Sequence, residues 1–335
     1  MADPSRPWSA GAATGVGSMP GTDPRASLQL VFDTLPDLPF LPELPARGPG
    51  AEMVGRAAAL LVDLPVEIQP SGWRLTSRAG RDLRRARDFL AADLDALSDL
   101  AAGYVGPLKV QYSGPLTLAA SIELRTGHRM VIDAGAVRDL ADSFAAGIAQ
   151  HAETVRVAVP GADVVVQFDE PALPAVLAGT IPTASGFGTI RSVPAAEAHD
   201  RLAAVLGPVG AGRRVVHCCA DDVPVGLLRD AGADAVSFDL DRRVDLDLLG
   251  QAVDSGTSLW IGAVPSTGGT RPKFQPVRDR IAQLWQRLGF PAGELATAVV
   301  PTPACGLAAA TPEYAQGALE AVRDAGLALL DLGGC

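Results

Sequence analysis

The chain has 335 residues, of which 48% are hydrophobic, enough to bury a large core without disulfide or metal support. Its net charge of −10 argues against a nucleic-acid surface, which needs clustered lysine and arginine. Four cysteines, two of them adjacent, are not the pattern of a disulfide framework, and no stretch is apolar for long enough to cross a bilayer. Because the N-terminus also lacks a signal-peptide core, we expect a soluble, cytoplasmic protein with no nucleic-acid or membrane partner.

Strand and helix signals alternate along the whole chain. Short apolar runs predict eight strands, at residues 13–16, 37–41, 108–112, 163–168, 213–216, 235–238, 258–262 and 296–300. Helical patterns lie between them, among others at residues 23–34, 51–61, 81–102 and 136–157. Two further short runs, residues 66–68 and 73–75, flank a Gln-Pro-Ser-Gly turn and predict an inserted hairpin. The fold class is therefore α/β, and the order predicts a (β/α)8 TIM barrel with a small inserted hairpin, forming a single catalytic domain over residues 1–335.

Chemically useful side chains follow most of the predicted strands. They are Ser18, Glu43, Ser113, Asp169, Glu170, His217, Cys219, Asp239 and Cys305. Active sites of such barrels form at the carboxyl ends of the strands, so this coincidence is what an enzyme would show. Turns are rich in serine and aspartate for conformational reasons alone, which accounts for the serines. It does not account for two thiols and a histidine, because cysteine is not a turn residue.

The most informative stretch is residues 213–219, where an apolar run ends in His217, Cys218 and Cys219. Side chains alternate along an extended segment, so positions 217 and 219 share one face and position 218 faces the other way. We therefore expect Cys219 to act beside His217 and Cys218 to pack in the core. With Cys305 they supply one nitrogen and two sulfur ligands, the usual basis of a zinc site. The alternative is that these cysteines only fill a buried strand.

Two carboxylates, Asp169 and Glu170, emerge from the buried run at residues 164–168. Ionised carboxylates in such a place need a cation or hydrogen-bond donors, so they indicate either a binding site or the cap of a helix. Asp239 has the same ambiguity, because Arg242 and Arg243 follow it and allow a simple salt-bridge cluster.

Taken together, the motifs resemble the catalytic, C-terminal half of cobalamin-independent methionine synthase in a short single-barrel form. The matching segments are residues 16–20 (VGSMP), 167–173 (QFDEPAL), 216–219 (VHCC), 233–239 (ADAVSFD) and 303–307 (PACGL). The resemblance implies zinc held by His217, Cys219, Asp239 and Cys305. It also implies that Asp169 binds the amine of the substrate amino acid, that the backbone at Ser18 contacts its carboxylate, and that Glu43 or Glu52 is the second amine-binding carboxylate.

The resemblance further implies a zinc-dependent methyltransferase that activates the thiol of homocysteine and forms methionine. Three departures bear on this. Position 239 is aspartate where the family has glutamate, so we expect Asp239 to be a weak or indirect ligand. The loop at residues 263–269 lacks the histidine that serves larger members as proton donor, and their N-terminal barrel is absent. The methyl donor is left open between methyltetrahydrofolate and a methylcobamide brought by a corrinoid carrier protein. The competing hypotheses are transfer to another small thiol and a barrel with a purely structural zinc.

Overall fold

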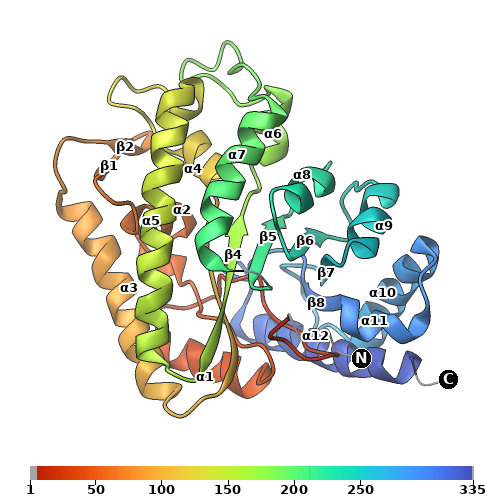
Figure 1. Ribbon diagram of the computed structural model, residues 1–335. Helices are drawn as coiled ribbons and strands as arrows, with labels where there is room; N and C mark the ends of the chain where they lie inside the picture. The colour runs from red at the N-terminus through yellow and green to blue at the C-terminus, as the bar shows by residue number, and fades with distance from the viewer. Residues whose placement is uncertain (1–5, 211, 334–335) are drawn as a thin grey trace.

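The computed structural model describes residues 6–210 and 212–333. Its main sheet contains six parallel strands in sequence order, and it curls strongly (Figure 1). The strands are β3 (Gly106–Ser113), β4 (Ala162–Asp169), β5 (Arg214–Cys218), β6 (Ala235–Asp239), β7 (Ser258–Val264) and β8 (Val299–Pro303). A separate antiparallel pair, β1 (Val66–Gln69) and β2 (Gly72–Leu75), is the hairpin that the sequence predicts.

The helices are α1 (Pro24–Thr34), α2 (Met53–Ala59), α3 (Arg81–Leu100), α4 (Pro115–Ser121), α5 (Ala134–Ala158), α6 (Leu173–Ala178), α7 (Ala195–Leu206), α8 (Val225–Asp230), α9 (Leu246–Asp254), α10 (Phe274–Leu288), α11 (Ala292–Ala298) and α12 (Pro312–Leu332). Most of them cover the outer side of the curled sheet, with the long helices α3 and α5 packed at one end of it (Figure 1). Among the described residues, no helix combines the length and the apolarity that crossing a membrane would require.

The sequence predicts eight barrel strands, but the described residues show a half-barrel of six. The segments at residues 13–16 and 37–41 form no strand, and isolated hydrogen bonds connect them to the sheet. The N–H of Thr14 donates to the carbonyl of Pro301, and the N–H of Leu41 donates to that of Lys109, at 3.3 and 2.9 Å. Glycines 11, 15 and 17 and prolines 36, 39, 42 and 45 explain the difference. Glycine weakens a strand, and proline has no N–H for a ladder.

The predicted strand at residues 296–300 is displaced along the chain. Ala292–Ala298 forms helix α11, and β8 begins only at Val299. The run from Ala292 to Ala298 contains three alanines, strong helix formers that an apolar count alone does not separate from strand residues. Strand β8 consequently ends two residues before Cys305 instead of five.

The two faces of the sheet carry different side chains. Residues such as Val164, Val166 and Phe168 face the helices and belong to the main core. The alternate positions face the concave side, where a smaller apolar cluster includes Trp8 and Trp260, with ring centroids 5.2 Å apart in an edge-to-face contact. Along β4, β5, β6 and β8, these concave positions become polar toward the carboxyl ends, at Gln167 and Asp169, His217, Ser237 and Asp239, and Thr302. The polar end of the concave face holds the candidate site.

Candidate metal centre and substrate pocket

His217, Cys219 and Cys305 come together at the carboxyl ends of β5 and β8. Each offers one ligand atom, and these three atoms all lie within 4.8 Å of one another. The sulfurs of Cys219 and Cys305 are 3.3 Å apart although 86 residues separate them in the sequence. Cys218 is fully buried and packs on the opposite face, with the helices, as the strand alternation predicts. The geometry therefore forms a nitrogen and sulfur site of the kind that binds zinc.

The imidazole of His217 is held by a residue that sequence reasoning did not single out. Its Nδ1 lies 2.9 Å from the hydroxyl of Ser237, which projects from β6 on the same concave side. Its Nε2 is buried and has no hydrogen-bond partner among the described residues. A hydrogen bond at one ring nitrogen that leaves the other free is the usual arrangement of a metal-binding histidine. The strand alternation of Ala235, Ser237 and Asp239 contained the signal for this contact.

The two sulfurs of the cluster differ in their proton affinity. The hydrogen bond with Cys219 and the neighbouring His217 lower the pKa of Cys305, whereas the same contact and burial raise the pKa of Cys219. Of the two sulfurs, that of Cys305 therefore takes the thiolate form, which metals bind, more readily than that of Cys219. Burial raises the pKa of Cys218 to about 12, in agreement with a packing role for this thiol.

Asp239, at the end of β6, lies outside this group of ligand atoms. One carboxylate oxygen accepts the N–H of Asp241 at 2.9 Å, and the other pairs with the guanidinium of Arg242 at 3.3 Å. The side chain is thus engaged by its own neighbours along the chain. Of the four side chains that the resemblance implies as zinc ligands, the fold brings three together and turns the carboxylate of Asp239 to other partners.

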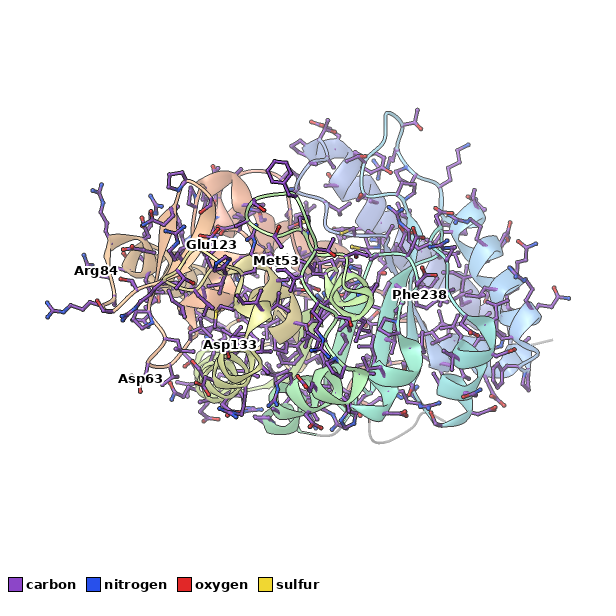
Figure 2. All side chains as sticks on the ribbon, turned by 90° about the horizontal axis from the view of Figure 1, so that it is seen from above. Met53, Asp63, Arg84, Glu123, Asp133 and Phe238 are labelled. Atoms are coloured by element: carbon purple, nitrogen blue, oxygen red, sulfur yellow. The ribbon has the colours of Figure 1, made fainter. Side chains whose placement is uncertain are left out.

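A cavity of about 250 Å³ opens beside the three ligand atoms. It is lined by Val16, Gly17, Ser18, Glu43, Pro45, Glu52, Met53, Asp169, Pro171, His217, Cys219, Cys305 and Gly306. In the view from above, Met53 lies near the middle of the molecule (Figure 2). Every predicted substrate-binding residue therefore shares one pocket with the cluster.

Asp169 and Glu170 are adjacent in sequence but do different things. Asp169 is 6% exposed, faces the pocket, and accepts a hydrogen bond of 2.7 Å from the amide of Gln167. Burial raises its pKa to about 6. Glu170 points away and accepts the N–H groups of Leu116 and Thr117 at 2.9 and 2.8 Å and the hydroxyl of Thr117 at 2.7 Å. It caps the first turn of α4. Glu170 therefore fits the capping hypothesis, whereas Asp169 faces the pocket as the binding-site hypothesis requires.

Glu43 and Glu52 both line the pocket, but their carboxylates have different surroundings. Glu52 accepts the N–H groups of Gly50 and Gly55 at 2.6 and 3.0 Å and the indole N–H of Trp73 at 2.6 Å. Glu43 is 4% exposed, and its Oε1 has no hydrogen-bond partner among the described residues. Burial raises the pKa of Glu43 to about 7. Glu43 thus makes fewer close contacts within the protein than Glu52, and the ion pair of its Oε1 with Arg56 is long, at 3.8 Å.

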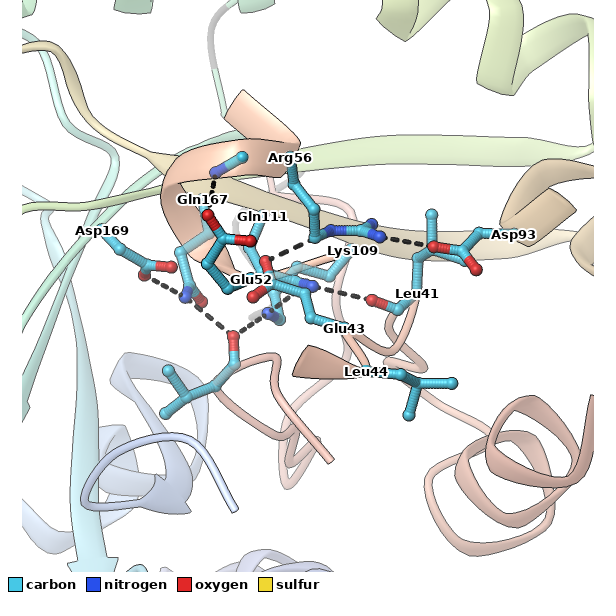
Figure 3. A network of polar contacts seen from close by, with 12 residues as sticks. Leu41, Glu43, Leu44, Glu52, Arg56, Asp93, Lys109, Gln111, Gln167 and Asp169 are labelled. Atoms are coloured by element: carbon cyan, nitrogen blue, oxygen red, sulfur yellow. Dashed lines mark hydrogen bonds and ion pairs between the residues drawn. The ribbon is translucent and has the colours of Figure 1, made fainter. Parts of the chain in front are cut away.

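Buried charges behind Glu43 hold it in place. The guanidinium of Arg56 lies 3.8 Å from Glu43 and forms an ion pair with Asp93 on its other side (Figure 3). Asp93 in turn accepts two hydrogen bonds from Arg47, at 2.7 and 2.9 Å. Sequence reasoning missed this chain of charges, because its members lie on α2, α3 and the loop before α2.

The turn at Ser18 approaches the pocket from the other end of the chain. The N–H of Met19 donates to the carbonyl of Glu43 at 2.8 Å, and the N–H of Leu307 donates to that of Ser18 at 2.7 Å. Gly306 makes this approach possible, since a Cβ atom there would lie 2.0 Å from the Ser18 hydroxyl. The Cys-Gly pair at residues 305–306 therefore serves both the metal centre and the turn.

Comparisons with known proteins identify the family of this chain and a similar fold. Residues 11–327 match the family described as the catalytic domain of cobalamin-independent synthase. Among solved structures, the fold is similar to that of a B12-independent methionine synthase from Shewanella sp. W3-18-1, determined in complex with selenomethionine. The TM-score is 0.63 at 14% identity, and the match covers 96% of this chain and 98% of that one. Among curated proteins, no sequence matches.

Proposed function

Because the chain belongs to the family of cobalamin-independent synthase catalytic domains, we propose that it is a zinc-dependent S-methyltransferase that methylates the thiol of homocysteine and forms methionine. The observation that carries this proposal is a single pocket shared by two kinds of group. His217, Cys219 and Cys305 bring their ligand atoms within 4.8 Å of one another, and two buried carboxylates, Asp169 and Glu43, line the same cavity.

The three grouped side chains suit zinc in the manner of a catalytic site. Catalytic zinc has three protein ligands and an open position, whereas structural zinc has four. The buried, unpartnered Nε2 of His217 supports metal binding, and Ser237 fixes the orientation of the ring. When bound, zinc supplies one piece of chemistry, which is to keep a substrate thiol in the nucleophilic thiolate form. We propose that Asp239 is a weak or indirect ligand, so that Asp239→Asn lowers zinc affinity about 10- to 100-fold, as for outer-shell groups.

The remaining pocket residues select an amino acid. Asp169 and Glu43 pair with its ammonium group, and the backbone N–H at Ser18 donates to its carboxylate. We assign the second amine-binding role to Glu43 because the carboxylate of Glu52 already accepts three hydrogen bonds from within the protein. A site that pairs both groups of an amino acid discriminates strongly against thiols that lack either one.

The same features weigh against the competing hypotheses. A structural zinc needs no cavity beside it and no pair of buried carboxylates facing that cavity. Another small thiol could use the metal, but without an amine it would bring no cation to the carboxylates of Asp169 and Glu43, which line the cavity. Covering a buried carboxylate with an uncharged group costs free energy, because the group replaces water without making an ion pair. Homocysteine therefore fits the pocket better than a thiol without an amine.

We further propose a methylcobamide, brought by a corrinoid carrier protein, as the donor. The N5 atom of methyltetrahydrofolate must gain a proton before its methyl group leaves, and the loop at residues 265–269 after β7 contains no acid and no histidine. Among the described residues that line the pocket, none is a lysine or arginine that could bind an anionic folate tail. A methylcobamide needs no proton at this step.

The test is a donor comparison with zinc-loaded protein and homocysteine, in which methionine is measured. We expect a higher rate with methylcobalamin than with methyltetrahydrofolate, and loss of both rates in Asp169→Asn. A higher rate with the folate would refute the donor assignment. If neither donor yields methionine while another thiol is methylated, homocysteine is the wrong acceptor.

A further inference from the structure

Three polar side chains are buried on the concave face of the sheet, below the pocket. Lys109 and Gln111 project from β3 and Gln167 from β4, and none is more than 1% exposed. The ammonium of Lys109 donates to the carbonyl of Val16 at 2.8 Å, and the amide of Gln167 donates to the same carbonyl at 2.9 Å (Figure 3). One backbone oxygen thus receives two buried side-chain donors from positions 93 and 151 residues away.

Gln111 does the same for the neighbouring segment. Its amide nitrogen donates to the carbonyl of Leu41 at 2.7 Å, and its amide oxygen accepts from Lys109 at 3.0 Å. The side chain also packs directly on Gly17, where a Cβ atom would lie 2.6 Å from the Cγ of Gln111. Glycine at position 17 is therefore required for the turn to approach β3.

These contacts replace a missing sheet ladder. The segments around Val16 and Leu41 are the two that form no strand, and a buried carbonyl without a donor costs about 1–3 kcal/mol. Each held carbonyl lies two residues before a pocket residue, Ser18 after Val16 and Glu43 after Leu41. These hydrogen bonds therefore restrain the backbone that sets the positions of Ser18 and Glu43.

Burying the ammonium group of Lys109 to make such a hydrogen bond costs free energy. A buried ammonium loses its hydration, and burial lowers the pKa of Lys109 to about 7. The charged groups facing it are Asp169 and Glu43, and the ring of Phe40 lies 5.2 Å from its nitrogen. An apolar residue of the same length would avoid the desolvation cost, so a role of the ammonium in the site accounts for its presence.

We propose that Lys109 is a positioning residue for the function proposed above. Its ammonium holds the Val16 carbonyl and thereby fixes the Ser18 turn that binds the carboxylate of the substrate, while Gln111 holds Leu41 and thereby fixes Glu43 on the amine side. Neither residue lines the pocket. Gln111 acts on the substrate through the backbone segment that it holds, and Lys109 does the same while its charge also faces the carboxylates of Asp169 and Glu43.

The test compares two variants against two truncated ligands. The ligand 4-mercaptobutanoate is homocysteine without its amine, and 3-aminopropane-1-thiol is homocysteine without its carboxylate. Dissociation constants are measured by calorimetry at about pH 7, where Lys109, with a pKa of about 7, still carries its ammonium in about half of the molecules and Asp169, with a pKa of about 6, is largely ionised. We expect Lys109→Met to weaken 4-mercaptobutanoate about 10- to 100-fold and 3-aminopropane-1-thiol less than about threefold. Gln111→Met should show the opposite preference, and both variants should keep their zinc.

A second measurement does not depend on any substrate. Hydrogen exchange of the Met19 and Glu43 amides, which bond across the two segments, should be faster in Lys109→Met than in the native protein. The milder Lys109→Gln, which keeps an N–H donor, serves if Lys109→Met does not fold. Equal weakening of both ligands, loss of zinc, or unchanged exchange at both amides would each overturn the proposal. If the native protein binds neither ligand but the exchange result holds, the proposed function fails and the positioning role stands.

Discussion

Replacing Asp169 with asparagine removes one charge from the pocket and changes its shape very little. Asp169 is 6% exposed, so an ammonium group bound there is out of water. Breaking such a buried pair costs about 3–5 kcal/mol, and Glu43, which remains on the other side of the ammonium, favours the lower value. About 3 kcal/mol is roughly a 100-fold increase in the dissociation constant of homocysteine. The amide of Gln167 still donates to the oxygen at position 169, which turns the new NH2 group toward the ammonium.

Calorimetric titration of zinc-loaded Asp169→Asn with homocysteine measures this loss, and metal analysis shows whether zinc is retained. Asp241→Asn is the matched control, because it makes the same change in the loop after β6, outside the pocket lining, where Asp241 pairs with Arg280. Its homocysteine affinity should remain near the native value. Unchanged homocysteine affinity in Asp169→Asn would remove this residue from the site. An equal loss for 4-mercaptobutanoate, which has no amine, would refute the ion-pair explanation.

Three further predictions concern the metal, a helix cap and pH. Metal analysis should find zinc lost in Cys219→Ala and Cys305→Ala and retained in Cys218→Ala; the reverse pattern would overturn the ligand assignment. Glu170→Gln should lower the free energy of unfolding by about 2–3 kcal/mol, because one of the buried N–H donors then faces another donor, and an unchanged denaturation midpoint would contradict this. Burial lowers the pKa of His151 from 6.5 to about 4, so the unfolded chain takes up the proton first and stability falls as pH decreases through that window. Urea unfolding at pH 7 and 4.5 should show a smaller loss of stability in His151→Gln than in the native protein; an equal loss in the two proteins would contradict this explanation.

The sequence by itself determined the group of candidate metal ligands and most of the sheet. His217 and Cys219 share a face because side chains alternate along a strand, and Cys305 joins them because parallel strands end at the same edge. The separation of Cys218 from its neighbour follows from the same alternation. Residues 216–219 and 303–307 also carried the resemblance to the family. These conclusions needed only local periodicity and the topology of a parallel sheet.

Contacts between distant residues decided the rest. Proline and glycine removed the first two strands, and Lys109 holds Val16 across 93 residues, a pairing that no local pattern contains. His151 on α5 is 8% exposed, and its ring packs edge-to-face against that of Tyr112, with ring centroids 5.4 Å apart, a contact between two elements that no local pattern contains.

The carboxylates show the same division between sequence and tertiary structure. The sequence placed Asp169, Glu170 and Asp239 at strand ends but could not choose among pocket, cap and salt bridge. That choice depends on which donors lie within reach, and those donors come from α4, β4 and the loop after β6. A carboxylate takes the role that its nearest donors allow, and only the folded chain brings those donors to it.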